Sequence, residues 1–148
     1  FMMVSRSSDS HFDFDLDKCR EGSADNPIFY IQYANARINS ILNKDDIAKE
    51  SDGNPDLSLL VEEKEIELIK KILSFPDTVL EASETMSPHK IAFFLQELAA
   101  QFHSYYRSTK VLVDDLEVSR ARVLLLRSLK TVFVNGLNLL GVSSPERM

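Results

Sequence analysis

The strongest constraint on the fold is an apolar stripe of helical period in the C-terminal half. Between residues 88 and 107 apolar side chains recur every three or four positions: Ile91, Phe94, Leu95, Leu98, Phe102 and Tyr105. Such spacing gathers apolar side chains on one side of an α-helix, which must then be buried against a neighbour. Ser87-Pro88 supplies an N-cap residue and a first-turn proline, so it predicts where this helix begins.

Residues 116–134 predict the last long helix of the chain. Its inward positions are Ala121, Leu125, Leu129 and Val132, and the small Ser128 on the same face would let a neighbouring helix approach. Asn135-Gly136 follows and is typical of a left-handed cap, so we expect the helix to stop there.

Three further helices are predicted upstream, at 25–43, 58–73 and 76–84, with a polar loop at 44–57. Asn26-Pro27 provides the cap and first turn of the first helix. The inward stripes are Ile31, Ile38 and Leu42 in the first helix and Ile66, Ile69 and Leu73 in the second. The sum is an all-α bundle of about five helices.

The N-terminal 16 residues have a different pattern. FMMV is apolar, SSDS is turn-like, and HFDFDLD alternates strictly, with Phe12, Phe14 and Leu16 on one face. This pattern predicts a short β-hairpin, and an isolated hairpin is barely stable in water. We therefore interpret residues 1–20 as the tail end of another domain, and residues 21–148 as the helical domain.

Composition excludes several classes of protein. The formal charge is −6, from 17 basic and 23 acidic residues, which excludes a strongly basic coat for nucleic acid. The single cysteine, Cys19, excludes a disulfide framework and a Cys-rich zinc site. Neither GxGxxG nor GxxxxGK[ST] occurs. No apolar run approaches about 18 residues, so we expect no membrane span. The segment FMMVSRSSD lacks the basic, apolar and small residues in the order that a signal peptide has, so we expect a cytoplasmic protein.

The residues also supply no recognisable active site. None of His11, His89 and His103 has a metal-ligand partner at i+3 or i+4, and no GxSxG occurs. His103 lies beside the apolar stripe, where a hydrogen-bonded packing role is favoured over catalysis.

One helix face carries chemistry suited to binding. Tyr30, Tyr33 and Arg37 lie within roughly 60° of one another on the 25–43 helix, away from its apolar stripe. Aromatic rings beside a guanidinium can stack on unpaired bases and hold a phosphate. The alternative is that the tyrosines simply pack beneath a neighbouring element.

A second candidate surface is the flank of the last helix. Residues 1–85 carry 9 basic and 18 acidic residues, a net charge of −9. Residues 86–148 carry 8 basic and 5 acidic residues, a net charge of +3. The C-terminal half therefore tolerates a polyanion better. Within it, Arg120 and Arg127 share a face, with Lys130 to one side, and could neutralise backbone phosphates. An ordinary solvated face is the alternative.

Three segments resemble one known family. Residues 26–37, NPIFYIQYANAR, closely resemble the NPxxYxQYAHAR segment of arginyl-tRNA synthetases. Residues 97–112, ELAAQFHSYYRSTKVL, are similar to that family's LAxxFHxFYxxxxVL, and residues 120–148 resemble its ARLxLxxAxxxVLxNGLxLLG core and terminal ERM. The N-terminal segment is similar to the strand pair that ends the family's catalytic domain. The resemblance covers essentially the whole chain, in order.

The resemblance implies that residues 21–148 are a DALR-type anticodon-binding domain. The parent enzyme, a class I synthetase, joins arginine to its tRNA through an arginyl-adenylate, using ATP and Mg²⁺. The HIGH-type and KMSKS-type motifs are absent here. We therefore expect no cofactor in this fragment and no activation of arginine by it alone. The expected partners are the anticodon loop of tRNA(Arg) and the catalytic domain of the same polypeptide, in a monomeric parent enzyme.

Individual residues carry over from the motifs. By resemblance, Tyr30 and Tyr33 match anticodon-side tyrosines, Tyr106 matches the tyrosine after FHx(F/Y), and Met148 matches a terminal methionine that approaches the loop. Arg37, Arg120 and Arg127 are added from the helix-face reasoning above.

The chain departs from the family pattern at a few positions. Asn35 replaces the usual His of QYAHAR, Ser128 replaces an Ala, and the tetrapeptide Ser119–Arg122 (SRAR) matches DALR only loosely. An amide can replace a hydrogen bond of His but cannot titrate near neutrality. The rival interpretation is a helical protein-interaction module that has lost tRNA binding and uses the Tyr30/Tyr33 face for a protein partner.

Overall fold

The computed structural model of the chain describes residues 26–44 and 55–148. These residues form α2 (Pro27–Lys44), the short 3-10 helix η1 (Leu57–Leu59), α4 (Glu63–Leu73), α5 (Phe75–Glu84), α6 (His89–Ser108) and α7 (Leu116–Leu139). Within these ranges no strand occurs, so the predicted all-helical class is confirmed for them. The predicted hairpin and the domain boundary after residue 20 lie outside the described residues, as does most of the predicted polar loop. No helix of the described ranges combines the length and apolarity that crossing a membrane requires.

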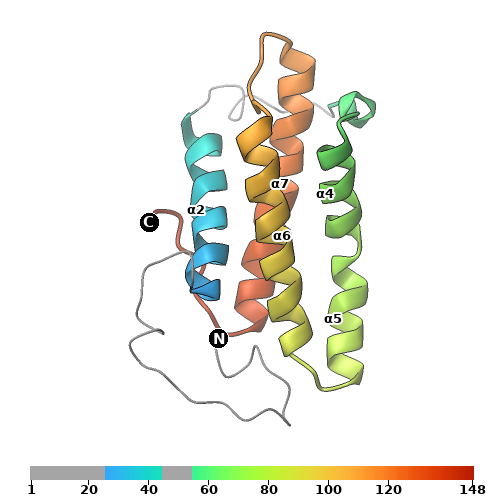
Figure 1. Cartoon of the computed structure of the whole chain (residues 1–148), viewed down its shortest axis with the longest axis vertical. Coiled ribbons are helices and arrows are strands. Elements are labelled where there is room, and N and C mark those ends of the chain that lie inside the picture. Colours follow the sequence, from blue (N-terminus) through green and yellow to red (C-terminus); the bar gives the residue numbers. More distant parts are fainter. Residues whose placement is uncertain (1–25, 45–54) are drawn as a thin grey trace.

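The helices stand side by side as a bundle (Figure 1). α2 packs against α6 and α7, while α4 and α5 pack against the other side of α6. Only Ser74 separates α4 from α5, and α5 continues the column that α4 begins (Figure 1). The five α-helices of the described residues therefore form four helical columns, because α4 and α5 share one column.

The apolar stripe of α6 forms the centre of the core. All six predicted positions are buried, and Leu95, Leu98, Phe102 and Tyr105 are completely inaccessible. The predicted inward positions of α7 are buried as well. Helix periodicity therefore predicted the burial of both long helices correctly.

The predicted end of the last helix is wrong. Gly136 is a buried residue inside α7, and the helix continues to Leu139. A Cβ built on Gly136 would lie 2.7 Å from Leu95 Cδ2, so glycine here lets α7 approach α6 closely. The left-handed residue is Gly141, at φ 67°, two residues beyond the helix. Asn-Gly therefore marks a close helix contact in this chain rather than a cap.

The predicted second helix begins later than expected and turns a different face inward. Leu57–Leu59 form η1, and α4 starts at Glu63 after a capping box between Glu62 and Glu65. Leu68 and Glu65 are buried and the predicted Ile69 packs half-buried against the core, whereas the predicted Ile66 and Leu73 are exposed. The helix is rotated because Glu65 is drawn into the core by Arg122 of α7, as described below.

Candidate functional site

Helix α2 places Tyr30, Tyr33 and Arg37 on one side. The Ile28 backbone N–H donates to Asn26 Oδ1 at 3.2 Å, and Pro27 occupies the first turn, so the start of the helix is well capped. Tyr33 is 38% exposed, and Tyr30 and Arg37 are half-buried.

Arg37 joins two tyrosines that lie on different helices. Its Nη1 donates to the Tyr33 hydroxyl at 2.7 Å, and its Cζ lies 5.6 Å from the Tyr33 ring centre and 4.8 Å from the Tyr106 ring centre. These distances are within the range of a cation–π contact. The structure therefore brings Tyr106, which is half-buried on α6, to the same place as the two α2 tyrosines.

His103 lies beneath this surface. Its ring centre is 4.7 Å from that of Tyr30, 5.7 Å from that of Tyr33 and 5.5 Å from that of Phe102. We refer to Tyr30, Tyr33, Arg37, His103 and Tyr106 together as the tyrosine face. Burial lowers the pKa of His103, a hydrogen bond with the Tyr30 backbone opposes this, and the charges of Arg107 and Arg37 lower it further. His103 therefore supports the tyrosine rings as a neutral side chain near neutral pH.

This environment predicts a loss of stability on the acid side. The folded-state pKa of His103 is lower than its unfolded value of about 6.5, so the unfolded chain binds more protons as the pH falls below that value. Replacing His103 with glutamine removes this contribution, so the free energy of unfolding should fall less between pH 7 and pH 5. Urea denaturation at a series of pH values measures it, with His89→Gln on the same helix as the control. Parallel pH profiles for His103→Gln and the unmodified chain would contradict the assignment.

Residues 142–148, here called the tail, run beside α2 (Figure 1). Gln32 Nε2 donates to the Ser143 carbonyl at 2.8 Å, and Asn35 Nδ2 donates to the Pro145 carbonyl at 3.0 Å. Lys130 of α7 pairs with Glu146 at 3.4 Å. The predicted site residue Met148 ends this segment and is 53% exposed.

The basic residues predicted on α7, Arg120, Arg127 and Lys130, show no contact with the tyrosine face among the described residues. Arg120 Nη1 lies 2.8 Å from Glu117 Oε1, one turn earlier on the same exposed surface. Arg127 is half-buried further along α7, and Lys130 points to the tail. The roles of Arg120 and Arg127 remain predictions.

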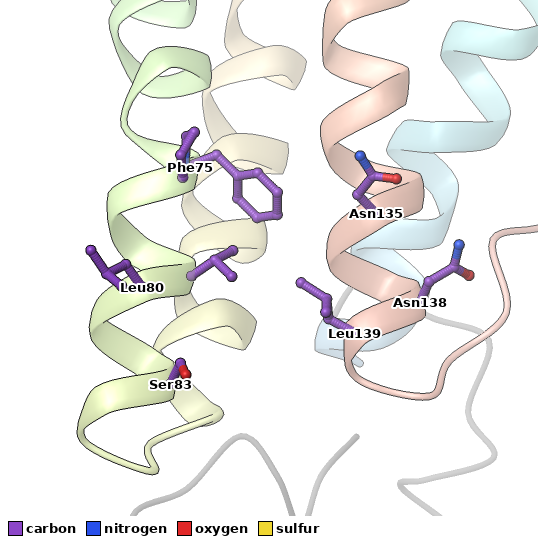
Figure 2. Close-up of a pocket in the computed structure, with 8 residues that line it drawn as sticks. Phe75, Leu80, Ser83, Asn135, Asn138 and Leu139 are labelled. Carbon is purple, nitrogen blue, oxygen red and sulfur yellow. The ribbon is translucent and has the colours of Figure 1, made fainter.

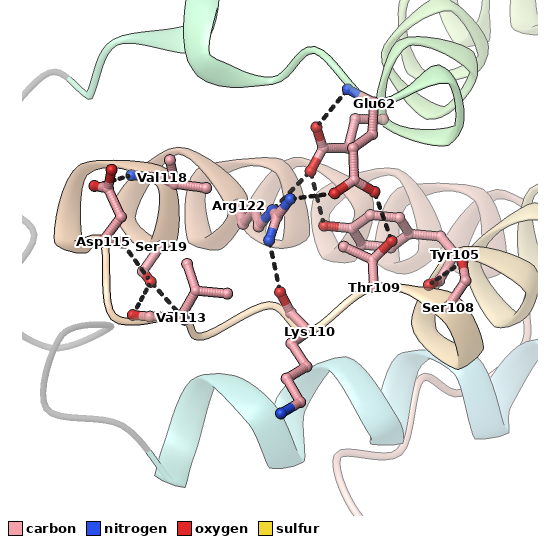
Figure 3. Close-up of polar contacts among 11 residues, drawn as sticks. Glu62, Tyr105, Ser108, Thr109, Lys110, Val113, Asp115, Val118, Ser119 and Arg122 are labelled. Atoms are coloured by element: carbon pink, nitrogen blue, oxygen red, sulfur yellow. Dashed lines mark hydrogen bonds and ion pairs between the residues drawn. The ribbon is translucent and has the colours of Figure 1, made fainter.

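A polar cluster, buried except for Glu62, links α4, α6 and α7, and sequence reasoning missed it (Figure 3). Arg122 Nε donates to Glu65 Oε1 at 2.7 Å, and its Nη2 donates to Glu62 Oε1 at 2.6 Å. The remaining contacts are the Tyr105 hydroxyl to Glu65 at 3.4 Å, the Thr109 hydroxyl to Glu62 at 2.8 Å and Arg122 Nη1 to the Lys110 carbonyl at 2.8 Å. We call these side chains the Arg122 network.

The titration of the network follows from its burial and pairing. Burial alone would lower the pKa of Arg122, but the hydrogen bond and the charge of Glu65 raise it above its ordinary value. Burial and the charge of Glu65 raise the pKa of Tyr105 far above its usual range. Arg122 therefore stays charged and Tyr105 stays protonated near neutral pH, and the position of the network suits a structural role.

The tetrapeptide Ser119–Arg122 anchors the connection between α6 and α7. Ser119 Oγ accepts from the Val113 N–H at 2.9 Å and donates to the Val113 carbonyl at 3.0 Å, while Asp115 caps α7 through the Glu117 and Val118 N–H groups. Together with Arg122 and the Lys110 carbonyl, these bonds hold the segment that follows Tyr106 (Figure 3). The network thus fixes the end of α6 that presents Tyr106.

One open groove in the described part of the chain lacks groups for catalysis. It has a volume of about 810 Å³ and lies between α5 and α7 (Figure 2). It is lined by Phe75, Pro76, Val79, Leu80, Ser83, Asn135, Asn138 and Leu139. None of these side chains titrates, so the groove offers no acid–base pair. Among the described residues, no group of three His, Cys, Asp or Glu side chains is arranged to hold a metal ion.

The described residues form a helical bundle whose tyrosine face carries partly exposed rings and a guanidinium. The chain belongs to the DALR anticodon binding domain family, whose model matches residues 31–148.

Known relatives agree with this membership. The chain is 48% identical to the arginine–tRNA ligase of Syntrophotalea carbinolica and 47% identical to that of Nitrosomonas eutropha, over its whole length in both cases. It covers 27% and 25% of those two proteins, so it spans about a quarter of the length of these relatives. Among solved structures, the chain is similar to the arginyl-tRNA synthetase of Thermus thermophilus, with a TM-score of 0.85 and 34% sequence identity. The match includes 99% of this chain and 25% of the Thermus protein.

Proposed function

We propose that this chain is the anticodon-binding part of an arginyl-tRNA synthetase and that its tyrosine face receives unstacked bases of the anticodon loop of arginine tRNA. The observation that carries the proposal is the joining of Tyr33 and Tyr106 through Arg37 on an accessible surface. The proposal draws its support from the family membership and from relatives that are arginine–tRNA ligases.

The chemistry of the face suits a single-stranded loop. Stacking of a base on an aromatic ring contributes about 1–3 kcal/mol and does not require a strongly basic surface. Arg37 adds a planar cation that can stack or pair with a phosphate. A net charge of −6 is therefore compatible with loop binding, although it would oppose binding along a duplex backbone.

In this proposal the chemical step belongs to the rest of a longer polypeptide. That part would bind ATP and Mg²⁺ and join arginine to the tRNA, while this chain would hold the far end of the same tRNA. We propose a monomeric, cytoplasmic parent enzyme. Met148 would add an apolar contact to the anticodon loop, and Arg120 and Arg127 would meet backbone phosphates.

The direct test is an affinity comparison between two RNAs. The intact protein is titrated with arginine tRNA and with the same tRNA carrying an altered anticodon, each over a series of salt concentrations. The proposal predicts weaker binding of the altered tRNA at every salt concentration. Equal affinities would contradict it and would favour the protein-interaction module, which the relatives do not support.

A further inference from the structure

The C-terminal end of α6 is held by side chains that belong to α4. Thr109, the C-cap residue of α6, donates its hydroxyl to Glu62 Oε2 at 2.8 Å (Figure 3). One turn earlier, Lys64 Nζ donates to the Ser104 carbonyl at 3.2 Å and to Ser108 Oγ at 2.9 Å. The last carbonyls of a helix have no partner inside the helix, so contacts of this kind keep the final turn ordered.

The held segment adjoins Tyr106 directly. Thr109 has extended backbone, at φ −122° and ψ 127°, and leads the chain away from the helix. Arg122 of α7 then holds the next residue, because its Nη1 donates to the Lys110 carbonyl at 2.8 Å. Tyr106 and Thr109 share the wall of one hollow of about 370 Å³, which is lined by Ile41, Tyr106, Thr109, Lys110, Val111 and Leu112.

Glu62 and Glu65 pair with the same arginine in different surroundings. Glu65 is 0% exposed, and its contact with Arg122 already places a carboxylate beside the buried guanidinium. The Glu62 side chain is 45% exposed, and an ion pair with so exposed a partner contributes little to stability. What Glu62 adds is a second oxygen, Oε2, that accepts the Thr109 hydroxyl. Holding the end of α6 therefore accounts for Glu62 better than stability alone does.

The position of the Tyr106 ring depends on that end of the helix. Tyr106 lies three residues before Thr109, slightly less than one helical turn. Its ring lies 4.8 Å from Arg37 Cζ and 6.0 Å from the Phe102 ring centre. If the last turn were to fray, the ring would lose this position. A base that stacks on the ring would then have to order it again, which lowers affinity.

We propose that Thr109 is a positioning residue for RNA binding: its hydroxyl, bonded to Glu62, fixes the end of α6 so that Tyr106 is held in place for the anticodon loop. This rests on the proposed function. Thr109 contacts no RNA in this account and acts through Tyr106. Two carboxylates of α4 thus have separate tasks, since Glu65 balances the buried charge of Arg122 and Glu62 sets the position of the α6 end.

The test compares three substitutions in the intact protein. Thr109→Val keeps the shape of the side chain but removes the hydroxyl, and Thr109→Ser keeps the hydroxyl. Thr78→Val is the matched control, because Thr78 is half-buried on α5 and donates its hydroxyl to the Ser74 carbonyl one turn earlier. Each variant is titrated with arginine tRNA. Hydrogen exchange of the peptide that covers residues 104–112 is recorded without RNA.

The proposal predicts faster hydrogen exchange in residues 104–112 of Thr109→Val and a loss of tRNA affinity of about three- to tenfold, the range set by one hydrogen bond. Thr109→Ser and Thr78→Val should both stay within about twofold of the unmodified protein. In a Tyr106→Ala chain, Thr109→Val should have no further effect on binding, because Thr109 acts through the ring that is already absent.

Three results would overturn the positioning role. The first is unchanged binding in Thr109→Val when Tyr106→Ala does weaken binding. The second is an equal loss of affinity in Thr109→Val and Thr109→Ser, and the third is losses that add in the double variant with Tyr106→Ala. If Tyr106→Ala itself leaves binding unchanged, the proposed function fails, so the two failures are distinguishable.

Discussion

Replacing Arg122 with alanine is expected to lower the free energy of unfolding by about 3–5 kcal/mol, because the change leaves Glu65 buried without its partner. Glu65 is 0% exposed and accepts the Arg122 Nε hydrogen at 2.7 Å. A carboxylate that loses such a partner must stay charged in the core or take up a proton, and both states cost free energy. Urea denaturation followed by circular dichroism measures the loss.

Arg120 supplies a matched control two residues earlier on the same helix. Its ion pair with Glu117 is exposed on both sides, so Arg120→Ala should cost less than about 1 kcal/mol. The paired substitution Arg122→Met with Glu65→Leu should be less destabilising than Arg122→Met alone, since it leaves no buried charge behind. Equal losses for Arg120→Ala and Arg122→Ala would contradict the structural role given to the Arg122 network.

Replacing Tyr106 with alanine is expected to weaken binding of arginine tRNA by about 5- to 150-fold, which corresponds to about 1–3 kcal/mol for one stacked base. The substitution removes a ring that lies 4.8 Å from Arg37 Cζ and 6.0 Å from the Phe102 ring centre. The guanidinium of Arg37 then loses one of the two rings that hold it. Equilibrium binding to the intact protein measures the effect.

Two further variants separate stacking from general damage to the helix. Tyr106→Phe keeps the ring and should retain most of the affinity. Phe93→Ala removes an exposed aromatic ring nearer the start of the same helix and should leave binding within about twofold. A loss of less than threefold in Tyr106→Ala would remove that residue from the site.

Local pattern was sufficient to predict the helical class and the core of the long helices. The stripe from Ile91 to Tyr105 on α6 depends on residues three and four apart, which a single helix brings together without help from the rest of the fold. The shared side of Tyr30, Tyr33 and Arg37 was predictable for the same reason.

Contacts between distant segments could not be derived from that pattern. Arg122 lies 57 residues from Glu65 and 60 from Glu62, so no local pattern connects these side chains. A buried charge that rotates a helix leaves no periodic signal, so Ile66 and Leu73 were placed inward although they are exposed. Asn35 was visible only as a departure from a motif, since its partner lies 110 residues away.

The meeting of the tyrosines required the packing of α2 against α6. His103 was expected to pack beside the apolar stripe, and it does, but its ring lies between the two helices and contacts both Tyr30 and Tyr33. Tyr105 and Tyr106 are adjacent in sequence, yet one joins the Arg122 network and the other contacts Arg37. Only the packed bundle determines which of the two reaches the tyrosine face.

Photo-crosslinking from the anticodon loop tests the central claim most directly. Arginine tRNA with a photoreactive uridine in the loop is bound to the intact protein and irradiated, and the crosslinked peptides are identified by mass spectrometry. We predict crosslinks to the α2 peptide that contains Tyr33 and to the α6 peptide that contains Tyr106. Crosslinks confined to other surfaces, such as the α7 peptide around Arg120 or the α5–α7 groove, would contradict the account.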